Sequence, residues 1–120
     1  MADQVSDLSA RVARMMGCVV HFPPSGYPVM MPSSPGPVVT MPMYASDLSA
    51  CLRDVVPWLL KRGHEPQMFV TFNGPAVLVR DYEAPGWRDV AHRAADMREG
   101  PLDQLLARLL CECALQVGNE

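Results

Sequence analysis

The 120-residue sequence lacks the arrangements that most metal sites and catalytic centres need. It has no Cys-x-x-Cys pair, and none of its three histidines, His21, His64 and His92, falls at ligand spacing from a cysteine. The glycine-rich phosphate loops, the nucleophile elbow and the zinc-protease motif do not occur. We therefore expect no metal, no cofactor and no catalytic residue, and the sequence favours a binding protein over an enzyme.

Charge is also scarce, since charged residues make up 19% of the chain and the formal net charge is −3. Binding to duplex nucleic acid relies on a dense basic surface, so we expect no such partner. No apolar run approaches the roughly 18 residues that span a bilayer, and the first residues do not resemble a secretory signal. We expect a cytoplasmic protein without a membrane partner, folded as one domain over residues 1–120.

The four cysteines are expected to be reduced thiols in the core, because free cysteine is among the most often buried residue types. They are Cys18, Cys51, Cys111 and Cys113.

Two helices are predicted in the first half of the chain. The first covers residues 3–16 and ends at Gly17. Its apolar positions recur every three or four residues, at Val5, Leu8, Val12 and Met15. The second begins at a cap on Ser46 or Asp47 and closes at 61–63, with a kink or a new start at Val56 because Pro57 costs about 3 kcal/mol inside a regular helix. Its apolar stripe comprises Leu48, Cys51, Leu52, Val55 and Leu59.

The segment between these helices is rich in proline. Residues 18–22 predict a short buried strand. Residues 23–43 hold seven of the twelve prolines, which predicts a mostly irregular Pro/Met-rich loop with a short strand at 38–40. A loop of this length is either functional or a variable insertion.

A hairpin is predicted around Asn73-Gly74, between strands at 67–72 and 76–82. Because Pro75 cannot donate a hydrogen bond, we expect a turn longer than two residues. Residues 87–96 fit a helix or a third strand equally well.

The last helix is predicted from Gly100-Pro101 onward. Its wide apolar stripe predicts burial against the sheet and against another surface, either a second subunit or an enlarged core of the same chain. The stripe comprises Leu102, Leu105, Leu106, Leu109, Leu110, Cys113, Ala114 and Val117.

Nine of the ten basic residues are arginine, whose planar side chain binds phosphate through two hydrogen bonds and stacks on bases. A GC-rich genome would raise the arginine content without any such role. Aromatic residues and arginines are interleaved over residues 69–93, where a hairpin could stack a base and neutralise phosphates. The alternative for Phe72 and Tyr82 is packing in the core, the commoner place for an aromatic side chain.

Three motifs, in order, resemble those of the small phage proteins called phage ABA sandwich domains. LSARVARMMG at 8–17 resembles the family's VAekVMGW start, YASDLSA at 44–50 resembles YSTDIsAA, and LARLLCECAL at 106–115 resembles its closing plAICrAAL helix. Cys18 stands where the family often has tryptophan, and Glu112 where the closing helix usually has arginine. Arg108, one turn earlier, is positioned to substitute for that arginine.

The resemblance implies an α+β fold in which an antiparallel β-sheet is packed between helices, a helix–sheet–helix sandwich, in a phage-encoded protein. Some proteins that resemble this family are oligomeric Thoeris anti-defence sponges. We therefore expect a homo-oligomer in the host cytoplasm that sequesters a cyclic nucleotide immune signal, either a cyclic ADP-ribose isomer or a cyclic oligonucleotide, without cleaving it. Tight, pre-organised binding is sufficient for such a role.

Under this hypothesis the ligand-binding residues make three kinds of contact: stacking on a base, hydrogen bonds to its edge and ion pairs with phosphate. Phe72 or Tyr82 stacks on a base, Asn73 contacts its polar edge, and phosphate is bound by Arg80, Arg88 or Arg108. The competing hypothesis is a phage protein-interaction module that occludes a host protein through the Pro/Met-rich loop, since methionine offers adaptable apolar contacts.

Overall fold

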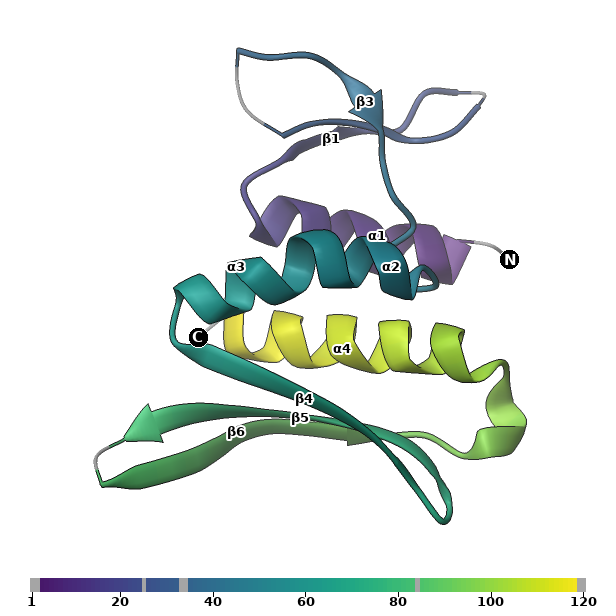
Figure 1. Cartoon of the computed structure of the whole chain (residues 1–120). Helices are drawn as coiled ribbons and strands as arrows, with labels where there is room; N and C mark the ends of the chain where they lie inside the picture. The colour runs from purple at the N-terminus through teal and green to yellow at the C-terminus, as the bar shows by residue number, and fades with distance from the viewer. Residues whose placement is uncertain (1–2, 25, 33–34, 84, 119–120) are drawn as a thin grey trace.

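The structure is a computed structural model that describes residues 3–24, 26–32, 35–83 and 85–118 (Figure 1). Helix α1 (Asp3–Met15) leads into a small sheet of β1 (Val19–His21), β2 (Val29–Met31) and β3 (Val39–Thr40). A second helical segment follows, comprising α2 (Leu48–Ala50), the π-turn η1 (Cys51–Val55) and α3 (Val56–Lys61). The chain then forms a large sheet of β4 (His64–Thr71), β5 (Gly74–Glu83) and β6 (Gly86–Ala94). The 3-10 turn η2 (Met97–Glu99) precedes the final helix, α4 (Leu102–Gly118).

These elements form four layers (Figure 1): the small sheet, then α1 beside α2–α3, then α4, then the large sheet. Both sheets are antiparallel, and helices pack on them, so the predicted α+β class is confirmed. In this layer order the helices lie between two sheets, whereas the resemblance implied one sheet between helices. The difference arises because all the described helices lie on the same side of the large sheet, so none covers its other face (Figure 1).

Helix α1 matches its prediction to within one residue. Gly17 ends it with a φ of +94°, and the amide of Cys18 donates to the carbonyl of Ala13 at 3.0 Å. This left-handed residue after the last turn is the usual place for glycine. Arg11 and Arg14 are exposed, while Val12 and Ala13 are buried.

The small sheet differs from its prediction in two respects. The strand expected at 18–22 is present as β1, but it is not buried, because this narrow sheet packs only one face on α1. The strand expected at 38–40 is confirmed as β3, whereas β2 was not predicted. Ser25, Ser33 and Ser34 of the Pro/Met-rich loop lie outside the described residues.

Asp47 caps the second helical segment by accepting a hydrogen bond from the amide of Ala50 at 3.1 Å. The predicted break at Val56 is confirmed, because the helix widens into the π-turn and α3 begins there, with Pro57 in its first turn. Pro57 cannot donate a hydrogen bond to the preceding turn, so a widened turn accommodates it at low cost. Leu52 was wrongly placed on the apolar stripe, since it is 47% exposed.

The large sheet contains the predicted hairpin. The segment 87–96, which fitted either a helix or a strand, belongs mostly to the third strand, because residues 86–94 form β6. The prediction of a longer turn was wrong. Phe72 and Asn73 make a two-residue turn between the paired residues Thr71 and Gly74. With the turn moved back by one residue, the carbonyl of Pro75 points toward Ala95, whose amide donates to it at 3.1 Å. Pro75 therefore does not need to donate to β4.

Helix α4 lies at the centre of the molecule. Its wide apolar surface packs on β5 and β6 on one side and on α1 and η1 on the other. The second surface that its stripe predicted is therefore supplied by the same chain. No described helix is both long and apolar enough to cross a membrane.

The cysteines are reduced throughout the described residues. Cys51, Cys111 and Cys113 are buried, as expected, whereas Cys18 is half-buried. The Sγ atoms of Cys51 and Cys111 lie 3.9 Å apart. The hydrogen bond between them, together with burial, raises the pKa of Cys111 well above its ordinary value. No group of metal-ligating side chains large enough to hold an ion occurs in the described parts of the chain.

Replacement of Gly74 by alanine is expected to destabilise the β4–β5 turn. Gly74 has a φ of +148°, and a Cβ there would meet the carbonyl oxygen of Ala95 and lie 2.8 Å from the amide nitrogen of Met97. We expect Gly74→Ala to lower the free energy of unfolding in urea by about 2–3 kcal/mol. Gly86→Ala is the matched control, because nothing lies within 4 Å of its Cβ position. Equal stability of the two variants would contradict the described turn.

Candidate ligand-binding groove

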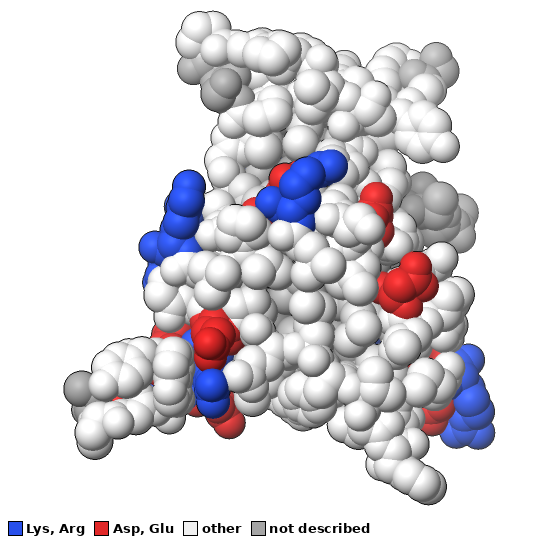
Figure 2. Space-filling view, in the orientation of Figure 1, with Lys and Arg blue, Asp and Glu red and all other residues white. Residues whose placement is uncertain are grey.

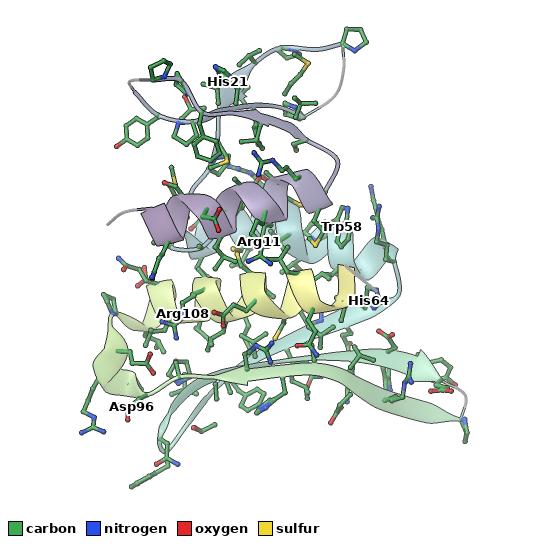
Figure 3. All side chains as sticks on the ribbon, turned by 180° about the vertical axis from the view of Figure 1, so that it is seen from behind. Arg11, His21, Trp58, His64, Asp96 and Arg108 are labelled. Atoms are coloured by element: carbon green, nitrogen blue, oxygen red, sulfur yellow. The ribbon has the colours of Figure 1, made fainter. Side chains whose placement is uncertain are left out.

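A polar groove runs between α1, α4 and β6 on the face seen in Figure 3, where Arg11 and Arg108 are labelled. It consists of two adjoining cavities of about 390 Å³ each. Both are lined by Leu8, Arg11 and Glu112. The first cavity adds Arg93, Leu115 and Gln116, and the second adds Gln4, Val5, Asp7, Ala45 and Arg108. We call this feature the arginine groove.

The polar side of the groove on α4 follows from helical spacing. Arg108, Glu112 and Gln116 are four residues apart, so they lie on one face of the helix. Each is half-buried, whereas Leu109 and Cys113 beside them are buried. This stripe occupies the part of α4 that neither the sheet nor the other helices cover.

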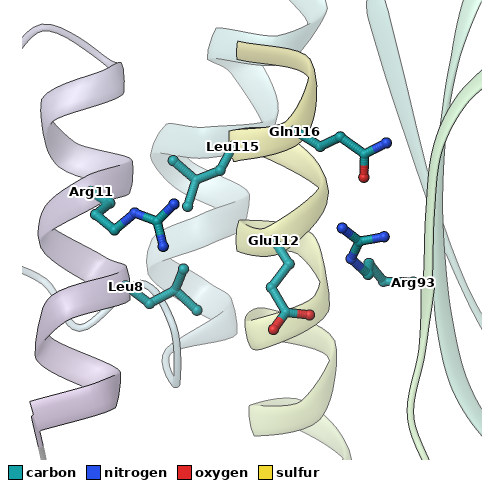
Figure 4. Close-up of a pocket in the computed structure, with 6 residues that line it drawn as sticks. All are labelled: Leu8, Arg11, Arg93, Glu112, Leu115 and Gln116. Carbon is teal, nitrogen blue, oxygen red and sulfur yellow. The ribbon is translucent and has the colours of Figure 1, made fainter. Parts of the chain in front are cut away.

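Arg93 reaches the groove from the large sheet. It pairs with Val77 across the β5–β6 ladder and shares the face of the sheet that packs on α4. In Figure 4 Arg93 and Arg11 extend from opposite sides, with Glu112 between them. Burial raises the pKa of the nearby Cys113 thiol to about 11, and the charge of Arg93 opposes that shift.

The guanidinium groups of the groove are incompletely paired. Neither Arg11 nor Arg93 forms an ion pair with a described carboxylate. Arg108 Nη2 lies 3.4 Å from Glu99 Oε1, and its buried Nε has no partner among the described residues. A buried donor without a partner costs about 1–3 kcal/mol. Arg11 and Arg93 are exposed, so their guanidinium groups are the ones that a ligand can reach.

The groove also contains an unpaired acceptor. Gln116 donates from Nε2 to the carbonyl of Val90 at 3.4 Å, which directs its Oε1 elsewhere. That oxygen is buried and finds no partner in the described structure. The groove therefore combines three arginine side chains with two acceptors on α4, Glu112 and Gln116.

Two of the residues predicted from the sequence, Arg80 and Tyr82, lie together on the outer face of the large sheet, away from α4. Arg80 packs over the Trp87 ring, 4.6 Å from its centroid, and donates to Glu65 Oε2 at 2.8 Å. The Tyr82 and Trp87 rings meet edge to face at 5.3 Å. Tyr82 is 61% exposed, so the alternative of core packing is wrong for it.

The other predicted residues lie elsewhere. Phe72 and Asn73 form the β4–β5 turn, where Phe72 is fully exposed rather than packed in the core. Arg88 lies near the opposite end of the sheet, with its Nε 3.2 Å from Glu83 Oε2. Arg108 alone of the six residues lines the arginine groove. The structure therefore does not bring the six predicted residues into one site.

A further cavity of about 570 Å³ lies between the small sheet and η1. At its polar end the buried Tyr44 hydroxyl donates to Asp54 Oδ2 at 2.7 Å, and Arg53 donates to both oxygens of Asp54 at 2.9 Å. The hydrogen bonds from Arg53, with a smaller contribution from Tyr44, hold the pKa of Asp54 below its ordinary value. These contacts connect the turn before α2 to η1.

The small sheet exposes an uncharged, largely apolar surface. No Asp, Glu, Lys or Arg occurs between Arg14 and Asp47, and in Figure 2 the region of this sheet is accordingly white. Its exposed large apolar side chains are Val19, Phe22, Tyr27, Val38 and Val39. We call these five residues the apolar cap.

Comparison of the chain with family models, with curated proteins and with solved structures finds no match.

The paired Asp54 predicts a loss of stability in acid. Since its pKa is lower in the folded than in the unfolded protein, its contribution is present above about pH 4 and is lost as the pH falls below that value. We expect the free energy of unfolding to fall less between pH 5 and pH 2.5 in Asp54→Asn than in the wild type. Asp89→Asn, an exposed position, serves as the control. If the free energy of unfolding of Asp54→Asn fell with pH as steeply as that of the wild type, this result would contradict the role of the carboxylate.

Proposed function

We propose that this protein binds a small phosphorylated ligand of the nucleotide class in the arginine groove and retains it without chemical change. The observation that carries the proposal is the convergence of Arg11, Arg93 and Arg108, from three different elements, on one groove. Each guanidinium can donate two parallel hydrogen bonds to a phosphate.

The unpaired arginines of the groove support an anionic ligand. Three arginines and two carboxylates, Asp7 and Glu112, line it, and Arg11 and Arg93 form no ion pair with a described carboxylate. A concave site focuses the field of such unpaired cations and concentrates anions there. Cavities of about 390 Å³ each fall within the range of ordinary small-molecule sites.

In its narrower form, the proposal is that the ligand is a cyclic nucleotide immune signal and that the protein is a phage anti-defence sponge acting in the host cytoplasm. The motif resemblance supports this form. Arg108 belongs both to the residues that the resemblance implied and to the groove, while Arg11 and Arg93 replace the other predicted phosphate contacts.

The apolar cap supports a second candidate function, which is binding of a partner protein through an apolar, uncharged surface. Exposed apolar patches of this kind commonly mark protein interfaces, and no charge in the segment would have to be desolvated on association. A second copy of the chain would also fit this surface, as the expected homo-oligomer requires.

Loss of the arginines should weaken ligand binding. We expect Arg11→Ala combined with Arg93→Ala to reduce affinity at least about tenfold, since a hydrogen bond to a charged group contributes roughly 1.5–3 kcal/mol. The measurement is isothermal calorimetry against cyclic dinucleotides, cyclic trinucleotides and cyclic ADP-ribose isomers. Arg14→Ala, on the same helix but outside the groove, is the control. Unchanged affinity in the double variant would remove the groove as the site, and recovery of a hydrolysed ligand would contradict retention.

If the second candidate function holds, partner binding depends on the side chains of the apolar cap. We expect Tyr27→Ser combined with Val38→Ser to abolish co-purification of one defined host protein, while Leu60→Ser, an exposed position on α3, preserves it. Light scattering on the same variants identifies a second copy as the occupant if the wild type is an oligomer and the double variant is a monomer. A monomeric wild type without a partner would contradict this function.

A further inference from the structure

We propose that Glu112 selects a guanine base, so that the arginine groove prefers guanine nucleotides over adenine nucleotides. The inference rests on the proposed function, because it names the base of the ligand that the arginines bind.

The first cavity of the groove presents an unpaired carboxylate. Glu112 and Gln116 are one helical turn apart on α4, and both line this cavity (Figure 4). Gln116 donates its amide hydrogen to the carbonyl of Val90, and its side-chain oxygen is buried beside the cavity, so Glu112 is the acceptor that a ligand can reach. The Glu112 carboxylate forms no hydrogen bond with any described residue. A ligand that fills the cavity must therefore bring donors as well as negative charge.

Guanine is the base whose hydrogen-bonding edge fits this requirement. Its N1–H and its 2-amino group are adjacent donors, and a carboxylate can accept from both at once. Adenine presents an acceptor, N1, beside its amino group, so a carboxylate there would face a lone pair and lose a hydrogen bond. A site built on hydrogen bonds rejects a ligand that leaves its buried groups unpaired.

The two arginines of this cavity flank the carboxylate. Arg11 approaches from α1 and Arg93 from β6, on either side of Glu112 (Figure 4). A guanine nucleotide can thus place its base edge on α4 and its phosphate on either guanidinium. The carboxylate and the cations then contact separate parts of the ligand instead of neutralising each other.

The test compares guanine and adenine forms of the same probes by isothermal calorimetry. The probes are cyclic GMP, cyclic IMP and cyclic AMP, with cyclic di-GMP and cyclic di-AMP as the larger pair. We expect each guanine probe to bind roughly tenfold or more tightly than its adenine counterpart. Cyclic IMP, which keeps N1–H but lacks the 2-amino group, should lie between them. Equal affinities would overturn the inference and leave the proposed function standing, while no binding by any probe would overturn both.

The substitution Glu112→Gln tests the role of the carboxylate directly. A glutamine can donate to adenine N1 and accept from its amino group, so we expect the preference for guanine to fall at least about tenfold and adenine binding to strengthen. Glu83→Gln, at the far end of the large sheet, should leave the preference unchanged. A full guanine preference in a folded Glu112→Gln protein would overturn the assignment, with the melting temperature of both variants confirming the fold.

Discussion

The burial of α4 from two sides is the constraint on which the rest of this structure depends. The helix packs on the large sheet through one face and on α1 and the second helical segment through another, so most of its circumference must be apolar. Its fully buried residues include Leu109, Leu110, Cys111, Cys113 and Ala114. With α4 in this position, the other helices are held one layer farther from the sheet, and the small sheet is placed outside them.

The same constraint explains why a polar groove exists at all. A helix enclosed almost completely can carry polar side chains only along the strip that remains uncovered. On α4 that strip holds Arg108, Glu112 and Gln116, at the gap between α1 and β6. The groove is therefore a by-product of how three elements surround one helix, and its position is fixed by the core and not by a mobile loop.

The sequence predicted those elements whose periodicity extends over several turns or strand residues. Helix α1, the break at Val56 and the β4–β5 hairpin were all visible, because each depends on local rules. Strand β2 was missed, since three residues between prolines show no alternation that can be recognised. The turn was placed one residue late because Pro75 was assumed to face β4, and strand register is not visible in a short pattern.

The candidate site was only partly accessible to sequence reasoning, for a geometric reason. Phe72, Arg80 and Arg88 are close in sequence, but a hairpin places its turn and its open end far apart and alternates side chains between two faces. Arg11 and Arg93, in contrast, are separated by most of the chain and meet only through tertiary packing. The one feature of the local sequence that indicated the groove was the four-residue spacing of Arg108, Glu112 and Gln116 among apolar residues of α4.

The uncharged stretch between Arg14 and Asp47 also gives the molecule two ends that differ in their response to ionic strength. Dissolved ions screen attraction between exposed arginines and an anion, with a screening length of about 8 Å at physiological salt. The apolar cap has no charge to screen, and strongly hydrated salts such as sulfate reinforce apolar association. A rise in sulfate concentration would therefore loosen whatever the groove holds while tightening whatever covers the small sheet, so salt alone can separate events at the two surfaces.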